Sequence, residues 1–129
     1  MIASDGEVEN GKGHPRVVGT YARILSRYVR DRRTLTLMDA LRKMSLMPAR
    51  RLEGATASAR RKGRVQEGAD ADLTIFDPAT VQDRATYEAG PVPSSGFRYV
   101  LVGGTPVVDD GKIVESVYPG RAVRRNAGP

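Results

Sequence analysis

Residues 63–78 read GRVQEGADADLTIFDP, and this stretch divides the chain into two parts of different character. Arg64-Val65-Gln66 favours a short β-like piece, and Glu67-Gly68 favours a turn. Ala71–Phe76 is apolar and partly β-branched, which predicts a strand, and Asp77-Pro78 ends it because proline cannot donate to a sheet ladder. The residues before this stretch are patterned as helices, and those after it as strands and turns. The residues suited to chemistry lie in the helical part.

Length, charge and residue usage limit the possible functions. The chain has 129 residues, the length of about one domain, and a net charge of +6. It has no cysteine and one histidine, His14, which excludes disulfides and a metal site built from several imidazoles of this chain. No apolar run approaches the roughly 18 residues of a membrane-spanning helix, and Met1 opens no signal-peptide pattern. We therefore expect a cytoplasmic protein with no membrane partner.

The positive charge gathers in three runs, which raises nucleic acid as a partner. These runs are Arg50-Arg51, residues 60–64 and Arg121–Arg125. No aromatic residues alternate with them for base stacking, and the chain has no helix-turn-helix or zinc pattern. We expect no specific nucleic-acid partner.

The first twenty residues hold three candidate functional residues. Met1–Ser4 is a short apolar run with no turn or cap ahead of it, as at the end of a buried strand, and residues 6–13 form a polar loop. Asp5 is either a turn residue before glycine or an acid at the carboxyl end of a strand, where barrel enzymes place catalytic groups. On their own, His14 is more typical of a loop and Arg16 of a solvated surface.

The helix predicted from Gly19 carries one apolar stripe and ends at residues 31–33, where cations suit the helix dipole. The stripe consists of Tyr21, Ile24, Leu25, Tyr28 and Val29. We expect the arginines off the stripe to form a solvated face; they are Arg23, Arg27 and Arg30. With sheet edges also uncovered, the stripe favours self-association through Tyr21, Ile24, Leu25 and Tyr28.

Two further helices are predicted before the dividing stretch. Thr36 opens the first of them, with Asp39 three residues later as in a capping box. Pro48 suits the first turn of the other, Pro48–Leu52, because proline has no amide hydrogen to leave unpaired.

The second part of the chain predicts strands joined by glycine turns. A long irregular stretch, residues 79–98, precedes them. The strands are expected at 99–102, 105–108 and 112–114, with turns at Gly103-Gly104 and at 109–111. Such a sheet has too few strands to close. Residues 122–129 are expected to form a basic tail.

Eight segments of the chain together carry a resemblance to a known family. They are SDG at 4–6, HPR at 14–16, GTYARIL from Gly19, TLMDALRKMSLMPARRL at 36–52, GRVQEGADADLTIFDP at 63–78, DRATYE at 83–88, YVLVGG at 99–104 and PGR at 119–121. This set resembles the C-terminal portion of an amidohydrolase, and within these enzymes the N-acyl-D-amino-acid deacylase (D-aminoacylase) group. The 63–78 pattern is common across amidohydrolases, whereas DRATYE and HPR point to the D-aminoacylase group.

The resemblance implies an α/β plus all-β fold. Residues 1–52 would supply the last strand, the catalytic loop and helices of a metal-dependent (β/α)8 barrel. Residues 53–121 would form the C-terminal part of a small β-sandwich, whose other strands come from the amino-terminal end of such enzymes. Residues 54–62 depart from the compact connection expected there.

The resemblance also implies a reaction and assigns roles. Asp5 would be the catalytic acid and base, and Arg16 would hold the substrate carboxylate, with His14 beside it as a substrate-binding residue. The family holds zinc through ligands that include a paired-histidine motif, and this chain has no H-x-H, so it would carry no metal ligand. We expect a metal-dependent hydrolase of the C–N bond of N-acyl-D-amino acids, which needs the amino-terminal barrel portion and is inactive as this chain alone.

A second interpretation is a non-catalytic α+β interaction module with a basic surface. The coverage of the eight segments favours the enzyme as ancestry, and the missing metal ligands favour the module for the isolated chain.

Overall fold

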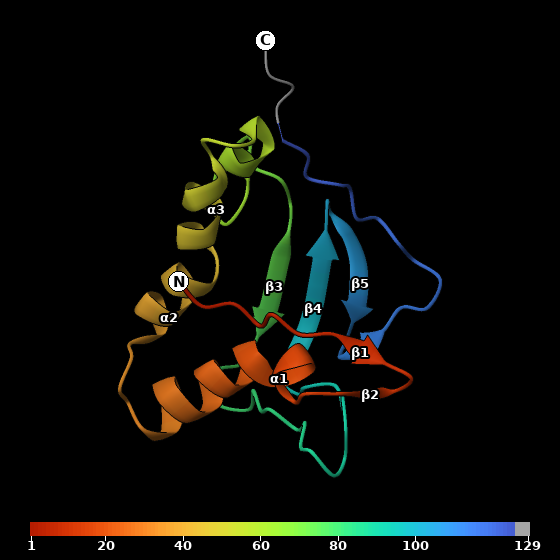
Figure 1. The fold of residues 1–129 in the computed structure, drawn as a ribbon. Coiled ribbons are helices and arrows are strands. Elements are labelled where there is room, and N and C mark those ends of the chain that lie inside the picture. Colours follow the sequence, from red (N-terminus) through yellow and green to blue (C-terminus); the bar gives the residue numbers. More distant parts are fainter. Residues whose placement is uncertain (126–129) are drawn as a thin grey trace.

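A computed structural model describes residues 1–125, in which the helices lie on the β3 side of a four-stranded antiparallel sheet (Figure 1). The helical elements are α1 (Arg16–Arg23), the π-helix η1 (Ile24–Asp31), α2 (Leu37–Met44), α3 (Leu46–Leu52) and the 3-10 helix η2 (Ala57–Arg61). The sheet has the order β3 (Leu73–Phe76), β4 (Phe97–Val102), β5 (Thr105–Asp109) and β6 (Lys112–Ile113). A separate hairpin of β1 (Val8–Glu9) and β2 (Lys12–Gly13) precedes α1. The predicted change from helices to strands is confirmed.

The first predicted helix forms, but it begins at Arg16 and not at Gly19. Buried Pro15 stands at its N-cap, where a fixed φ suits the start of a helix. The helix continues as η1, whose wider turns include a hydrogen bond from Arg32 N–H to Arg27 O, five residues back, at 2.9 Å. It ends at Asp31, as predicted from the cations there.

The two shorter helices begin close to the predicted positions. Asp39 N–H donates to Thr36 Oγ1 at 3.1 Å, which confirms Thr36 as the N-cap of α2. The Thr36 hydroxyl in turn donates to the Asp39 carboxylate at 2.8 Å. Helix α3 begins at Leu46, ahead of Pro48, which still lies in the first turn, where its missing amide hydrogen leaves no donor unpaired.

Both predicted hairpin turns are confirmed in the sheet. Gly103 and Gly104 have φ values of 57° and 83°, and Asp110 and Gly111 have 44° and 79°. Positive φ at both central residues is the type I′ geometry, whose twist matches that of paired strands. Strands β4, β5 and β6 therefore follow one another as neighbours.

Two predictions about the N-terminal residues are wrong in detail. Residues 6–13 are not only a loop, because Asn10 and Gly11, with φ values of 50° and 72°, close the β1–β2 hairpin. Met1–Ser4 forms no strand; Ile2 N–H donates instead to Lys43 O at 3.0 Å. An isolated segment cannot form a sheet ladder, and the described residues place no partner strand beside this one.

The β-like piece expected at residues 64–66 is also absent. Arg64 instead donates to Lys62 O at 3.0 Å and pairs with Glu53 at 2.5 Å, which folds the segment back toward α3. The strand that follows begins at Leu73, later than the predicted Ala71, and ends at Phe76, directly before Asp77-Pro78 as predicted.

The hydrophobic core joins the first helix to the connection between β3 and β4. Ala22, Leu25 and Val81 form its buried centre. Partly buried side chains of α2 and the sheet pack against it; they are Leu37, Leu41, Met44, Phe76 and Phe97. Because Leu25 is buried inside the chain, its predicted place in a self-association contact is wrong, whereas Tyr21 is exposed.

The dividing stretch is held by an ion-pair network. Asp72 accepts hydrogen bonds from Gly103 N–H at 2.8 Å and from Lys62 Nζ at 2.5 Å, and Lys62 Nζ also lies 3.0 Å from Asp70. The hydrogen bonds from Lys62 lower the pKa of both carboxyl groups, and the hydrogen bond with Asp72 raises the pKa of Lys62. The acidic residues of this stretch therefore tie η2 to the turn between β4 and β5.

Past β6, residues 114–125 are in neither helix nor strand. Residues 122–125 of the predicted basic tail are in neither helix nor strand, and residues 126–129 lie outside the described residues. Within residues 1–125, none of the helices is both long and apolar enough to cross a membrane.

Candidate functional site

Asp5 and Arg16 come together at the start of the first helix. Asp5 has a positive φ of 44°, and the following Gly6 lies so close to the helix that a Cβ there would meet Val17 Cγ2 at 2.5 Å. Arg16 Nη2 lies 4.0 Å from Asp5 Oδ2, and the two side chains are 51% and 96% exposed. The pair is a loose one in water, so both charged groups remain available to a third partner.

His14 is bound at both ring nitrogens. Its Nδ1 accepts a hydrogen bond from Arg16 N–H at 3.1 Å, and its Nε2 lies 2.6 Å from the Tyr87 hydroxyl. The two rings also meet edge to face, with centroids 5.1 Å apart and planes at 77°. Because Nδ1 accepts, the neutral ring carries its hydrogen on Nε2, which donates to the Tyr87 oxygen. His14 therefore links the segment 83–88 to the backbone of Arg16.

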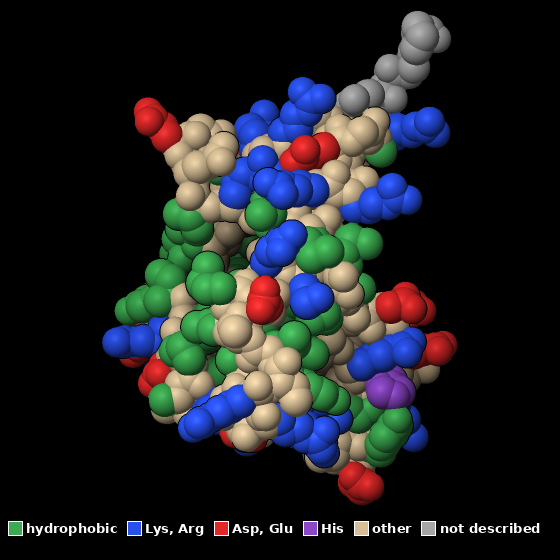
Figure 2. All heavy atoms as spheres, turned by 90° about the vertical axis from the view of Figure 1, so that its left-hand side faces the viewer, with side chains coloured by type: hydrophobic (Ala, Val, Ile, Leu, Met, Phe, Trp, Pro, Cys, Tyr) green, Lys and Arg blue, Asp and Glu red, His purple; other side chains and the backbone are tan. Residues whose placement is uncertain are grey.

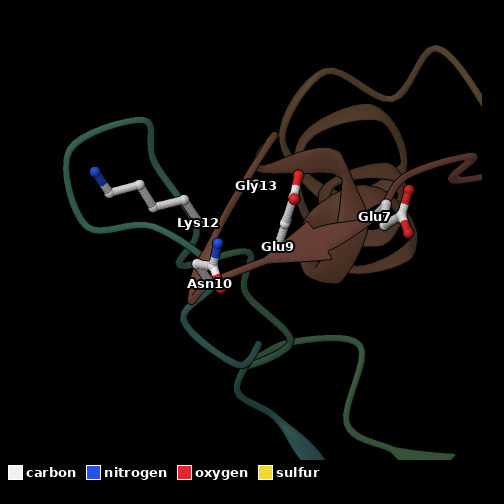
Figure 3. A pocket seen from close by; sticks show the side chains of 5 residues that line it. All are labelled: Glu7, Glu9, Asn10, Lys12 and Gly13. Carbon is white, nitrogen blue, oxygen red and sulfur yellow. The ribbon is translucent and has the colours of Figure 1, made fainter.

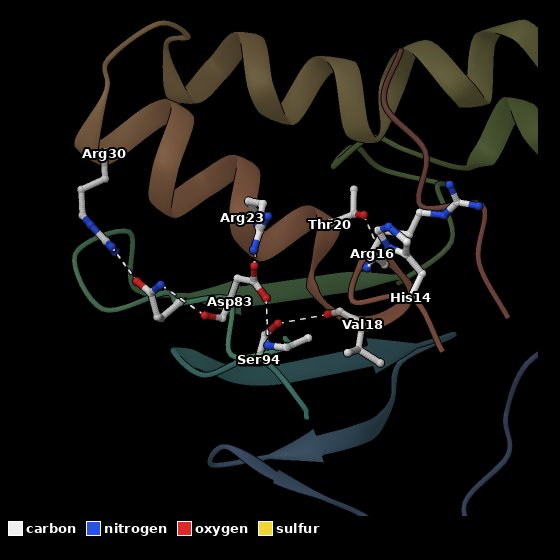
Figure 4. Close-up of polar contacts among 10 residues, drawn as sticks. His14, Arg16, Val18, Thr20, Arg23, Arg30, Asp83 and Ser94 are labelled. Carbon is white, nitrogen blue, oxygen red and sulfur yellow. Dashed lines mark hydrogen bonds and ion pairs between the residues drawn. The ribbon is translucent and has the colours of Figure 1, made fainter. Parts of the chain in front are cut away.

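A hollow of about 230 Å³ opens between the start of α1 and the segment 83–88. It is lined by His14, Pro15, Arg16, Gly19, Thr20, Arg23, Asp83, Ala85, Thr86, Tyr87 and Glu88. Figure 4 shows Arg23 of α1 facing Asp83, with Thr20 one turn closer to the start of the helix. Asp5 is not among the lining residues. Both arginines of this hollow can attract an anion, and Arg16 is the one without a hydrogen-bonded carboxylate.

The inner wall of this hollow is an ion pair that sequence patterns did not indicate. Arg23 Nε donates to Asp83 Oδ2 at 2.6 Å, and the Asp83 side chain is only 6% exposed. Asp83 Oδ1 also accepts from Ala85 N–H at 3.0 Å. A Cβ at Gly19 would lie 2.9 Å from Asp83 Cγ, so the missing side chain of this glycine makes room for the carboxylate.

Arg30, predicted to lie on a solvated helix face, instead forms hydrogen bonds with the β3–β4 connection. Its guanidinium donates to Val81 O at 2.7 Å and to the Gln82 side-chain oxygen at 2.9 Å, and it pairs with Asp31 at 2.9 Å. Arg23 is likewise ion-paired. At Arg30 the helix surface is covered by the β3–β4 connection, whose carbonyl groups supply the acceptors, whereas Arg27 is exposed as predicted.

Glu88 is a second acidic residue in the lining of the hollow. Hydrogen bonds from its own backbone N–H and from the Thr86 side chain lower the pKa of Glu88. This carboxylate is therefore ionised at neutral pH and adds a negative charge to a lining that also contains Arg16 and Arg23.

A larger hollow, of about 590 Å³, lies at the β1–β2 hairpin. Glu7, Glu9, Asn10, Lys12 and Gly13 line it. Lys12 points away from Glu7 and Glu9 (Figure 3), so the charged groups do not converge on one point. The hairpin holds no set of groups arranged for catalysis.

The described residues do not assemble a metal centre. Residues 1–125 contain no group of three or more His, Cys, Asp or Glu side chains placed to hold one ion. A catalytic zinc needs about three protein ligands, and both nitrogens of His14 are engaged by Arg16 and Tyr87. These residues therefore do not fit a zinc ion by themselves.

The structure brings all three predicted site residues into one region. Asp5 and His14 each contact Arg16, the first through its carboxylate and the second through the backbone. Sequence reasoning missed Tyr87 and Asp83, whose partners lie 73 and 60 residues away along the chain. The DRATYE segment contained both residues, but only as part of a resemblance.

Comparison with known proteins identifies the family. The sequence model of the amidohydrolase family matches residues 1–108. The N-acyl-D-glutamate deacylase of Alcaligenes xylosoxydans is 42% identical over 127 residues, which are 98% of this chain and 25% of that enzyme. The crystal structure of D-aminoacylase has a TM-score of 0.85 and 38% identity, covering 97% of this chain and 25% of that one.

A third relative adds a ligand-bound state. The N-acyl-D-glutamate deacylase of Bordetella bronchiseptica, in complex with zinc and a phosphonate mimic of the tetrahedral intermediate, has a TM-score of 0.79 at 39% identity. The match covers 96% of this chain and 25% of that one. This chain thus spans about a quarter of the length of these relatives. It belongs to the amidohydrolase family and corresponds to the C-terminal portion of enzymes of the N-acyl-D-amino-acid deacylase group.

Proposed function

We propose that this chain works as the C-terminal portion of a metal-dependent hydrolase of N-acyl-D-amino acids. The observation that carries the proposal is the placement of Arg16 beside Asp5, with 4.0 Å between guanidinium and carboxylate. One group binds a carboxylate and the other moves protons, and an N-acyl amino acid offers both a carboxylate and an amide to hydrolyse. Relatives that act on N-acyl-D-glutamate support the substrate class.

Asp5 acts as the general base and acid in this proposal. Amide hydrolysis requires a proton to leave the attacking water and a proton to reach the departing nitrogen. An exposed aspartate that is only loosely paired can accept the first proton and deliver it in the second step. Catalysis of this kind contributes about 10²–10⁴-fold to the rate.

Arg16 holds the substrate carboxylate. A guanidinium presents two parallel N–H donors to a carboxylate, which lysine cannot do. The Arg16 side chain is half exposed and makes no short hydrogen bond with Asp5, so a substrate carboxylate can take its place at the fork. His14 lies next to it and fixes its backbone.

The proposed architecture follows from the same relationship. Residues 1–52 complete a (β/α)8 barrel, residues 53–121 complete a β-sandwich, and both depend on segments that match the other three quarters of the relatives. Zinc, which polarises the amide carbonyl and activates water when bound, takes its ligands from those segments. The chain by itself then binds no stoichiometric zinc and hydrolyses no N-acyl-D-amino acid.

The test is an enzyme in which this chain replaces the matching portion of the Alcaligenes N-acyl-D-glutamate deacylase, called here the reconstituted enzyme. We expect hydrolysis of N-acetyl-D-glutamate. Asp5→Asn should lower kcat by about 10²-fold or more with little change in KM, because the proton transfer belongs to the transition state. Arg16→Lys should mainly raise KM, because the substrate carboxylate is bound in ground state and transition state alike. A folded but inactive reconstituted enzyme would instead favour the non-catalytic module.

A further inference from the structure

The connection between β3 and β4 lies along the first helix and is fastened to it at several points. Ser94 Oγ donates to Val18 O at 3.0 Å and Asp83 pairs with Arg23 (Figure 4), and Arg30 binds the backbone at Val81. At the amino-terminal end of this row, the Tyr87 hydroxyl meets His14. The sheet part of the chain thereby places the Tyr87 side chain against His14, next to Arg16.

We propose that Tyr87 is a positioning residue for Arg16 and acts through His14. This inference rests on the proposed role of Arg16 in binding the substrate carboxylate. Tyr87 does not touch that carboxylate in the proposal; it fixes the ring that fixes the arginine.

Burial does not explain the position of Tyr87. Tyr87 is 74% exposed, so its ring does not fill the core. The backbone around it is nevertheless held in place, because Ala85 N–H donates to Asp83 Oδ1 at 3.0 Å and Ala89 N–H donates to Thr86 Oγ1 at 2.9 Å. These hydrogen bonds fix the backbone of the loop, and the fixed backbone places the Tyr87 hydroxyl 2.6 Å from His14 Nε2.

The contact between Tyr87 and His14 also fixes the orientation of the hydrogen-bond acceptor of Arg16 N–H. An imidazole held at Nε2 by Tyr87 cannot rotate, so its Nδ1 stays aimed at Arg16 N–H. Without the hydroxyl, the exposed ring is free to turn, and the first residue of α1 loses a fixed acceptor. The guanidinium then samples more directions, and binding of a carboxylate costs more conformational entropy.

The kinetic test uses the reconstituted enzyme with N-acetyl-D-glutamate. Tyr87→Phe keeps the ring and removes the hydroxyl, and we expect KM to rise about three- to tenfold, as for the loss of one hydrogen bond, with kcat within about twofold. His14→Asn keeps a side-chain oxygen for Arg16 N–H but does not reach Tyr87, and we expect the same rise. The double variant should be no worse than either single one, because both break the same link. Tyr118→Phe, at another exposed tyrosine, is the control and should leave KM unchanged.

A second measurement decides the question without turnover. Hydrogen exchange of the Arg16 amide should be faster in Tyr87→Phe than in the parent enzyme and unchanged in Tyr118→Phe. If the parent does not hydrolyse the substrate, the proposed function fails, but this exchange measurement still supports or overturns the coupling. An unchanged KM, additive effects in the double variant or an unchanged Arg16 exchange rate would each overturn the proposal.

Discussion

Replacing Gly19 by alanine tests whether helix α1 packs so closely on Asp83 that a side chain at this position displaces the carboxylate. In an ordinary helix this change stabilises the fold by about 1 kcal/mol, because alanine has a much higher helix propensity than glycine. Here the new Cβ would lie 2.9 Å from Asp83 Cγ and nearer still to Oδ1. The carboxylate must therefore move, and it cannot keep its hydrogen bonds with Arg23 and Ala85.

The expected loss is larger than the gain. A hydrogen bond to a charged group contributes about 1.5–3 kcal/mol, which applies to the contact between Asp83 and the Ala85 amide. The ion pair with Arg23 adds less, about 0–1 kcal/mol, because the arginine side chain is 49% exposed. With the gain of about 1 kcal/mol subtracted, Gly19→Ala should lower the free energy of unfolding by about 0.5–3 kcal/mol.

A double-mutant cycle separates the two contributions. In an Asp83→Ala background the obstruction is gone, and Gly19→Ala should now stabilise the chain by up to about 1 kcal/mol. Gly54→Ala serves as the control, since a Cβ there meets nothing within 4 Å. The free energies come from urea denaturation of the chain followed by circular dichroism. If Gly19→Ala stabilises the unsubstituted chain, or has the same effect in both backgrounds, then a side chain at position 19 does not displace the Asp83 carboxylate.

Three further outcomes are expected. Gly96→Ala should destabilise the chain by about 2–5 kcal/mol in the same urea assay, because Gly96 has a φ of 86° and a Cβ there would lie 2.5 Å from Val81 N; a loss below 1 kcal/mol would contradict this. Asp72→Asn should lower Tm at neutral pH. Because folding lowers the pKa of Asp72, its stabilising contribution is present above the pKa of the unfolded chain and is lost as pH falls, so the difference in Tm from the parent should fade below about pH 4. A difference in Tm that is constant with pH would refute this. The raised pKa of Lys62 places the alkaline loss of the same network above about pH 10. We also expect the isolated chain to self-associate through exposed apolar side chains of its helical face (Figure 2), as measured by light scattering. Tyr21→Ser should reduce this association, and a monomer at all concentrations would count against it.

The sequence predicted those features that depend on neighbouring residues. Thr36 caps its helix with a residue three positions away, and Gly103-Gly104 turns the chain within a single hairpin. Both depend on backbone geometry that a short segment sets by itself. The same is true of the strand that ends before Asp77-Pro78.

Features that depend on distant partners were not predictable. Arg23 and Arg30 have the spacing of solvated residues, and only the folded chain places Asp83 and the Val81 carbonyl over them. The β-like piece predicted around Val65 does not form for the same reason, because Arg64 forms an ion pair with Glu53. The family resemblance predicted Asp5, His14 and Arg16 as site residues. Only the folded structure places Tyr87 against His14.

The fastened connection between β3 and β4 also bears on how this protein can be altered. An irregular surface stretch of this length is ordinarily where a chain tolerates inserted peptides or new termini. Here Val81, Asp83, Tyr87 and Ser94 are each anchored to the first helix or to the residues just before it. An epitope tag or a circular permutation placed between these anchors should therefore alter the substrate affinity of the reconstituted enzyme even where folding survives.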